Sequence, residues 1–137
     1  MNARETALLS LVGFGVWLSG AVSVRLGGAL MFETGPASLA LSAAAIALSV
    51  CLLLRAIMGW RGAPAASSVT VAAVLILPGL FCDVAYILNF SAVTGLRPTA
   101  AAYAVTIFFA TGVLLAYALI RAAPARRHRG RCSAPRC

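Results

Sequence analysis

Four long apolar runs, separated by short segments that contain arginine, glycine or proline, constrain this chain more than any other feature. The runs cover residues 7–24 (extending, beyond one arginine, to 32), 37–54, 69–90 and 100–120. About 20 apolar residues in helical form cross the ~30 Å hydrocarbon core of a bilayer. Since backbone in lipid must satisfy its own hydrogen bonds, each run predicts a helix. The predicted fold is all-α, a bundle of four transmembrane helices.

The composition excludes an ordinary soluble domain, because 62% of the residues are hydrophobic and only 10% are charged. The formal net charge is +8, and all eleven basic residues are arginine. Six of them lie from Arg121 onward and the others flank the apolar runs, a distribution that does not indicate nucleic-acid binding. Abundant alanine and arginine without lysine are typical of a GC-rich bacterial genome. We therefore expect a multi-pass protein of a bacterial inner membrane.

The arginines also predict orientation. Residues 122–137 combine arginine with alanine, proline and glycine without an apolar period, which predicts a disordered tail. Four spans place the N-terminus, the connector 55–68 and this tail, with Arg121 just before it, on one side. These segments hold nine arginines, whereas the opposite loops hold Arg25 and Arg97. Positively charged segments stay in the cytoplasm, so both termini are expected there. The tail would also contact anionic lipid.

Asp83 is the one carboxylate inside an apolar run. An acidic residue within a span is costly and marks a functional site by default. Pro78 cannot donate a hydrogen bond to the carbonyl of residue 74, which predicts a kink one turn before Asp83. Gly79 and Tyr86 share a helix face with Asp83, and the glycine would let a neighbouring helix approach the carboxylate. The candidate polar site therefore comprises Asp83 and Tyr86, together with Arg25.

Two alternatives describe the environment of Asp83. In the first, Asp83 forms an ion pair with Arg25 of the first helix, which lowers the cost of both charges. In the second, Arg25 reaches the lipid headgroups or pairs with Glu33, while Asp83 is protonated and hydrogen-bonded, for instance to Tyr86. The sequence does not decide between them.

The sequence contains few residues in arrangements that bind a metal or cofactor or catalyse a reaction. His128, Cys132 and Cys137 lie near one another in the arginine-rich tail, but three ligands are too few for a closed tetrahedral site. The two glutamates, Glu5 and Glu33, lie outside the apolar runs, so no carboxylate pair can form within the membrane. We expect no metal, no cofactor and no enzymatic activity.

A resemblance to a known family rests on two groups of residues. One is the segment 77–83, Leu-Pro-Gly-Leu-Phe-Cys-Asp; the other is the series Trp17, Arg25, Gly28 and Phe32. With these, residues 10–120 resemble a bacterial domain-of-unknown-function family of short four-span membrane proteins. The resemblance implies no activity, but it adds weight to Arg25, Pro78, Gly79 and Asp83. Gly28 is a further candidate for helix packing.

Two functional hypotheses follow. In the first, the protein has an accessory or interaction role, with a second copy or another membrane protein as partner, and Asp83 and Arg25 stabilise helix assembly. The alternative is a small proton-coupled transporter that uses Asp83, as a homo-oligomer because four thin helices enclose little volume. Small multidrug transporters are also short four-helix proteins, but their essential glutamate lies in the first span. The run 7–24 contains no carboxylate.

Overall fold

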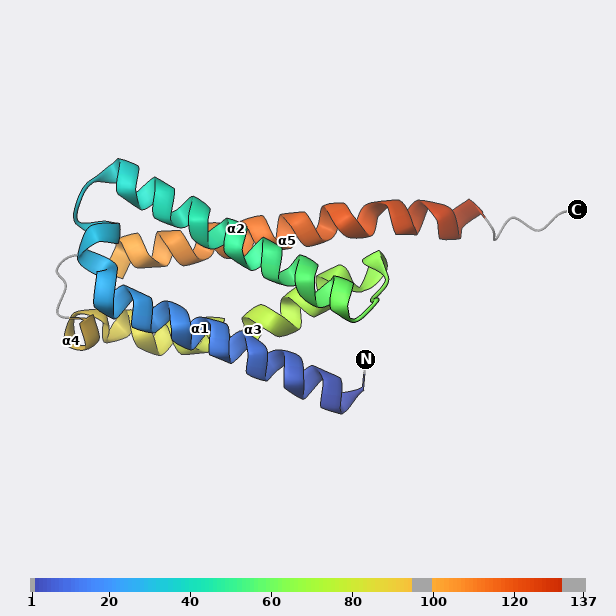
Figure 1. Cartoon of the computed structure of the whole chain (residues 1–137), viewed down its shortest axis with the longest axis horizontal. Coiled ribbons are helices and arrows are strands. Elements are labelled where there is room, and N and C mark those ends of the chain that lie inside the picture. The colour runs from blue at the N-terminus through green and yellow to red at the C-terminus, as the bar shows by residue number, and fades with distance from the viewer. Residues whose placement is uncertain (1, 95–99, 132–137) are drawn as a thin grey trace, which may run out of the picture.

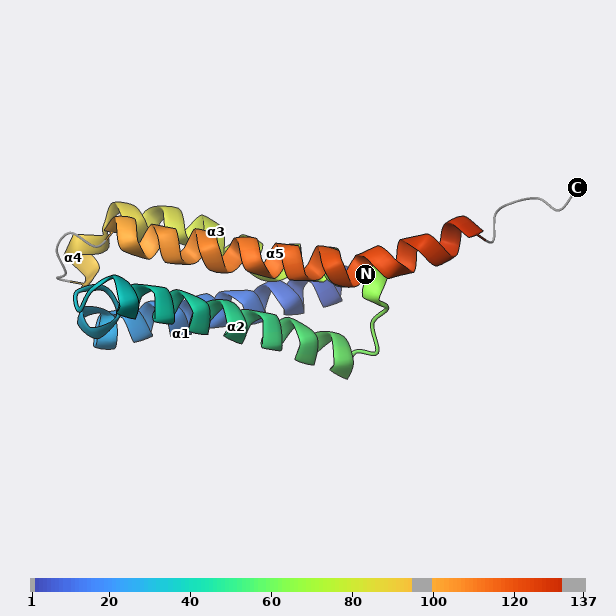
Figure 2. The ribbon, with the colours of Figure 1, turned by 90° about the horizontal axis from the view of Figure 1, so that it is seen from above.

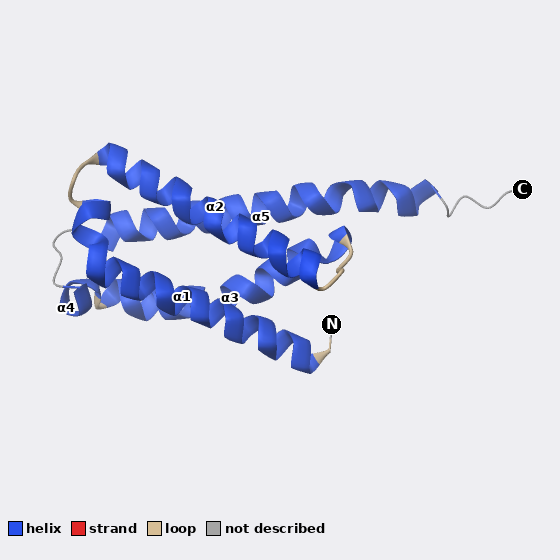
Figure 3. Cartoon of the chain, viewed as in Figure 1, coloured by secondary structure: helices blue, strands red, loops and turns tan. Residues whose placement is uncertain are grey.

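The computed structural model describes residues 2–94 and 100–131, with side chains at 2–90, 92–94 and 100–123. This part of the chain is helical throughout and contains no strand (Figure 3), which confirms the predicted all-α fold. The elements are α1 (Ala3–Phe32), α2 (Pro36–Trp60), the 3₁₀ turn η1 (Ala65–Ser67), α3 (Ser68–Leu88), α4 (Phe90–Thr94) and α5 (Ala100–Arg131).

Four of the helical segments are long and apolar enough to cross a membrane. They are Ala3–Phe32, Pro36–Trp60, Ala65–Leu88 and Ala100–Ala123. Large apolar side chains cover their outer surfaces, among them Leu26, Phe81 and Ile120, each more than two-thirds exposed. Such a surface is stable in contact with lipid and not with water. The chain is therefore built as a multi-pass membrane protein.

Glycine and proline set the turn between α1 and α2. Gly35 has a φ of 127°, which other residues rarely adopt, and Pro36 occupies the first turn of α2, where its missing N–H costs nothing. Arginine, in contrast, does not end the helices. Helix α2 continues past Arg55 to Trp60, and α5 continues past Arg121 to Arg131, into the region predicted to be a disordered tail. Alanine and arginine favour helix, which explains both extensions.

The long helices form two layers, with α1 and α2 in one and α3 and α5 in the other (Figures 1 and 2). Across the layers, α1 packs mainly on α3 and α2 on α5. Helices α1 and α3 approach closely at Gly13, where an added Cβ would lie 1.9 Å from the carbonyl oxygen of Leu75. Small residues allow this kind of backbone contact between helices in lipid.

Two buried clusters fill the bundle. One contains Leu9, Leu54, Met58, Val71, Ala72, Leu114 and Ala118. The other is rich in aromatic rings and contains Ala21, Val24, Phe32, Tyr86, Phe90 and Tyr103. At the end of the bundle near the N-terminus, Glu5 and Arg61 form an ion pair of 3.1 Å, the one ion pair within the described ranges. This pair places the start of α1 beside the connector between α2 and α3.

Candidate functional site

Asp83 lies on the face of α3 that is turned into the bundle, and its side chain is 5% exposed. Its Oδ1 accepts two hydrogen bonds, from the indole Nε1 of Trp17 at 2.8 Å and from the hydroxyl of Tyr103 at 2.7 Å. Trp17 belongs to α1 and Tyr103 to α5. A single carboxylate oxygen therefore joins three helices.

Gly79 makes room for the indole, one turn before Asp83 on the same face of α3. A Cβ at this position would lie 3.3 Å from Trp17 Cβ and 3.4 Å from Trp17 Cδ1. These contacts are at the short end of what packed side chains tolerate, so a larger residue would move Trp17. The close approach predicted for Gly79 is present, and Trp17 is the residue that uses it. Pro78 lies inside α3, which continues without a break from Ser68 to Leu88.

Tyr103 belongs to a cluster of aromatic rings on one side of Asp83. Its ring centroid lies 5.1 Å from that of Tyr86 and 5.4 Å from that of Phe90. Tyr86 meets Trp17 edge to face, with centroids 6.0 Å apart. Rings at such distances attract one another and pack rigidly. The cluster therefore fixes the two donors that bind Asp83.

The ion pair between Asp83 and Arg25 is not formed. The hydrogen bonds that the second alternative expected are present, but they come from Trp17 and Tyr103. Arg25 is exposed, and its guanidinium donates to the main-chain carbonyl of Val93 in α4. Tyr86 donates to the carbonyl of Ala21 at 3.3 Å instead of to the carboxylate. The reason is the register between α1 and α3: Trp17 lies opposite Asp83, and Arg25 lies eight residues farther, about 12 Å along the helix axis.

Gly28 lies on the packed face of α1 and is buried, as its predicted packing role requires. The tail residues suggested as weak metal ligands contribute no side-chain geometry. Cys132 and Cys137 lie outside the described residues, and His128 lies in α5 at a position whose side chain is also outside them. Within the described residues, no three His, Cys, Asp or Glu side chains come together in a group that could hold a metal ion.

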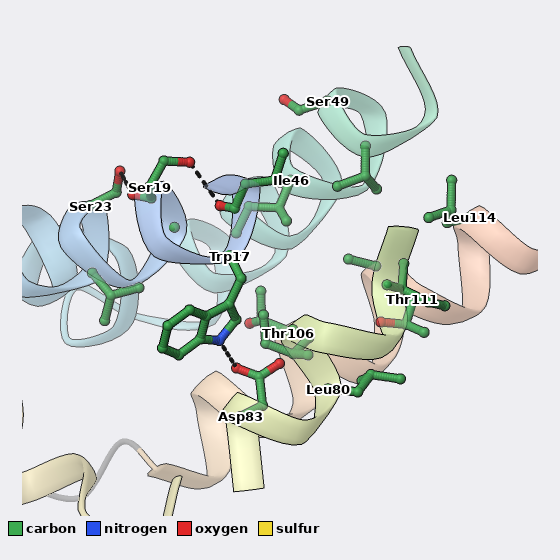
Figure 4. Close-up of a pocket in the computed structure, with 18 of the residues that line it drawn as sticks. Trp17, Ser19, Ser23, Ile46, Ser49, Leu80, Asp83, Thr106, Thr111 and Leu114 are labelled. Atoms are coloured by element: carbon green, nitrogen blue, oxygen red, sulfur yellow. Dashed lines mark hydrogen bonds between the residues drawn. The ribbon is translucent and has the colours of Figure 1, made fainter. Parts of the chain in front are cut away.

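A cavity of about 320 Å³ lies beside Asp83, lined by residues from all four long helices. Its walls are mainly apolar, with polar atoms from Asp83, Trp17, Tyr103 and several hydroxyls. Figure 4 shows Trp17, Asp83, Thr106 and Leu114 around it. Pockets of about this size and character bind small ligands in many proteins. A single chain therefore forms a cavity of this size, open on one side, without a second copy.

The second carboxylate oxygen, Oδ2, has no hydrogen-bond partner among the described residues. Figure 4 shows it turned away from the indole of Trp17. This oxygen is also not fully enclosed by protein atoms. Among the described residues, the one side-chain atom that is both fully enclosed and without a hydrogen-bond partner is a guanidinium nitrogen of Arg61. The cavity therefore contains a carboxylate oxygen that is open to a ligand.

Comparison with protein-family models gives one match, to a family of unknown function (DUF5367), over residues 31–125. The match covers most of the chain. The chain belongs to the DUF5367 family. This membership confirms the resemblance to a family of unknown function, and four apolar helices fit the expected four-span arrangement. No curated protein and no solved structure matches this DUF5367 chain.

The DUF5367 match includes two of the three residues that form the hydrogen-bonded centre. Asp83 and Tyr103 lie inside the matched region, and Trp17 lies before it. The signal that could have identified Trp17 was present in the sequence. An indole deep in an apolar run needs an acceptor for its N–H, and Asp83 is the one carboxylate within the runs.

Proposed function

We propose that this DUF5367 protein binds a small ligand within the membrane, with Asp83 Oδ2 as the polar group that receives either the ligand or a proton. The observation that carries the proposal is the difference between the two oxygens of Asp83. Oδ1 holds Trp17 and Tyr103, while Oδ2 is open beside a cavity of about 320 Å³. Oδ1 can accept both bonds whether or not Oδ2 carries a proton. Proton binding at Oδ2 therefore does not require the helices to separate.

Few other groups near Asp83 can titrate. Of the described residues that line the cavity, Asp83 and Tyr103 alone have ionisable side chains. Tyr86 packs against Tyr103 from α3, and Arg25 is exposed on α1. The lining residues of α2 are Ile46, Ser49, Val50 and Leu53, and α4 has no ionisable residue. A ligand that enters the cavity therefore meets Asp83 as the one carboxylate of the described lining residues.

Proton-coupled transport is the second candidate, and the cavity is the observation that favours it. Exchange of a proton for a ligand at one carboxylate is the minimal chemistry of such a transporter. The cavity is formed by one chain, so a homo-oligomer is not needed to build it. The contrasting proposal is an accessory role with a protein partner, in which Asp83 only holds the helices together. A catalytic role is not proposed.

The proposed location is a bacterial inner membrane, with both termini in the cytoplasm. The arginine distribution supports this orientation, since nine arginines fall on the side of the termini and two on the other. Contact of the C-terminal arginines with anionic lipid remains part of the proposal. A reporter that fluoresces only in the cytoplasm, fused after residue 137, is expected to be active; a periplasm-dependent phosphatase at the same place is expected to be inactive.

The binding proposal is tested by the fluorescence of Trp17. The chain has two tryptophans, and Trp60 is 90% exposed, so Trp60→Phe leaves Trp17 as the single probe beside Asp83. We expect a saturable change in Trp17 emission when small apolar molecules with a polar or charged end are added at constant pH, and a weaker change or none once Asp83→Asn is added. The asparagine side chain keeps an oxygen for both donors but carries no charge. A flat titration in the Trp60→Phe protein would assign Asp83 a structural role and favour the accessory hypothesis.

A further inference from the structure

The exposed residues of the cavity wall are all on one side of the bundle. They are Ser19, Gly20 and Ser23 of α1, and Ser49 of α2. The lining residues of α3 and α5, Asp83 and Tyr103 among them, are buried or half-buried. The cavity therefore opens between α1 and α2, in the layer opposite the helix that carries Asp83.

This opening lies at the level of the hydrocarbon core. Gly20 is near the middle of α1 (Ala3–Phe32) and Ser49 near the middle of α2 (Pro36–Trp60). The exposed neighbours of the opening are apolar: Leu18 and Val22 on α1, and Leu48 and Leu52 on α2. Water is absent at this depth of a bilayer. A molecule that passes between α1 and α2 at this point must come from the lipid phase.

The polar atoms around the opening and the cavity are mostly acceptors. Four lining hydroxyls donate to carbonyl oxygens of their own helices at 2.7 to 2.9 Å: Ser19, Ser23, Ser49 and Thr106, the first two visible in Figure 4. Trp17 and Tyr103 donate to Asp83. Of the lining hydroxyls, that of Thr111 has no partner in the described part of the chain and keeps a free donor. The other hydroxyls offer only lone pairs, and Asp83 Oδ2 offers the strongest acceptor.

An acceptor-rich apolar cavity selects a ligand that brings donors or positive charge on an apolar body. A carboxylate binds an ammonium group through charge-assisted hydrogen bonds, and aromatic faces such as those of Trp17 and Tyr103 also attract cations. An anion would instead meet Asp83 without a compensating cation, since the guanidinium of Arg25 is bonded to Val93 in α4.

We infer that the ligand is a lipophilic ammonium compound that enters the cavity from the bilayer through the opening between α1 and α2. The inference rests on the proposed function, because it names the ligand class and the route for the Asp83 site. The ammonium group would occupy the position beside Oδ2, and the apolar body would fill the rest of the cavity.

The ligand class is tested with two probes of the same shape and opposite charge, adamantylammonium and adamantane carboxylate. Protein with Trp60→Phe in lipid nanodiscs is titrated with each, and binding is followed by Trp17 emission and by calorimetry. We expect saturable binding of the ammonium compound, and binding weaker by roughly tenfold or more for the carboxylate and for the ammonium compound on Asp83→Asn. Equal binding of both probes would overturn the inference about ligand class.

The route is tested at Gly20, with Gly15 as a matched control. Both glycines are exposed on α1, and a Cβ at either would meet nothing within 4 Å, but only Gly20 lines the cavity. We expect Gly20→Phe to lower the association rate of adamantylammonium by about tenfold or more, and Gly15→Phe to leave it unchanged. Circular dichroism checks that both variants fold.

The outcomes separate the two proposals. If Gly20→Phe and Gly15→Phe bind the ammonium probe at the same rate, the lateral route is wrong while the Asp83 site stands. If Gly20→Phe instead changes the oligomeric state and not the binding, a second copy covers this face, and the inference is also overturned. If Trp17 emission responds to no probe of either charge, the proposed function itself fails.

Discussion

The indole of Trp17 donates to Asp83 at 2.8 Å and so connects α1 to α3 between residues that are 66 positions apart in the sequence. The same oxygen accepts the hydroxyl of Tyr103, so α5 is held at this point as well. Between helices in lipid there is little hydrophobic driving force, and close packing and hydrogen bonds decide how they associate. The contacts of Asp83 are therefore expected to affect the stability of the bundle as well as its site.

Substitutions of Asp83 should separate its structural and ligand-binding roles. Asp83→Asn retains an acceptor for Trp17 and Tyr103, so we expect the free energy of unfolding to change by less than about 1 kcal/mol. Asp83→Leu has a similar volume but leaves both donors without an acceptor, and should cost about 2 kcal/mol or more. Unfolding by SDS in mixed micelles, followed by circular dichroism, measures both. Equal losses in the two variants would contradict the role assigned to Oδ1.

The two donors should show coupled effects. We expect Tyr103→Phe to cost about 0.6 to 1.7 kcal/mol, the usual range for a hydrogen bond between membrane helices. Trp17→Phe should cost more, because it also replaces the indole by a smaller ring and leaves space inside the bundle. Since both bonds end on one oxygen, the double variant should differ from the sum of the single variants by about 0.5 kcal/mol or more. Strict additivity in this double-mutant cycle would argue against a shared acceptor.

Arg25 should act independently of Asp83. Its guanidinium bonds to Val93 in α4, and the carboxylate is satisfied by Trp17 and Tyr103. We expect the effects of Arg25→Gln and Asp83→Asn on unfolding to add within about 0.5 kcal/mol. Rescue of one substitution by the other would restore the ion pair as the better description of this site.

The sequence was sufficient to predict the helical fold and the burial of Asp83 inside the bundle, because lipid tolerates neither unpaired backbone groups nor an exposed carboxylate. It was less informative about helix ends. Two apolar runs end just before Arg55 and Arg121, but helices α2 and α5 continue beyond these residues. The backbone hydrogen bonds of a helix do not require apolar side chains, and arginine can extend toward the headgroups. The short helix α4 was not predicted.

The partners of Asp83 depend on the register between helices, which the sequence does not show. Arg25 was a reasonable partner by charge, but the packing of Gly13 on Leu75 and of Trp17 on Gly79 aligns a different turn of α1 with Asp83. Tyr103 lies near the start of an apolar run, where tyrosine is common as an interfacial ring, so its position in the sequence does not indicate a contact with Asp83. Only the tertiary packing shows that it is buried at 3% exposure. The cavity likewise arises from side-chain packing and has no sequence signature.

The stability of the bundle should be especially sensitive to substitution of Gly13, where α1 approaches α3 without a polar side chain between them. A Cβ at Gly13 would lie 1.9 Å from the carbonyl oxygen of Leu75, whereas one at Gly15 on the same helix would meet nothing within 4 Å. We expect Gly13→Ala to destabilise the protein by about 2 kcal/mol or more, and Gly15→Ala to be neutral or slightly stabilising. Because Gly13 and Trp17 are one turn apart on α1, the first substitution should also change the emission of Trp17. An unchanged emission and stability in Gly13→Ala would contradict the register between α1 and α3 on which the Asp83 site depends.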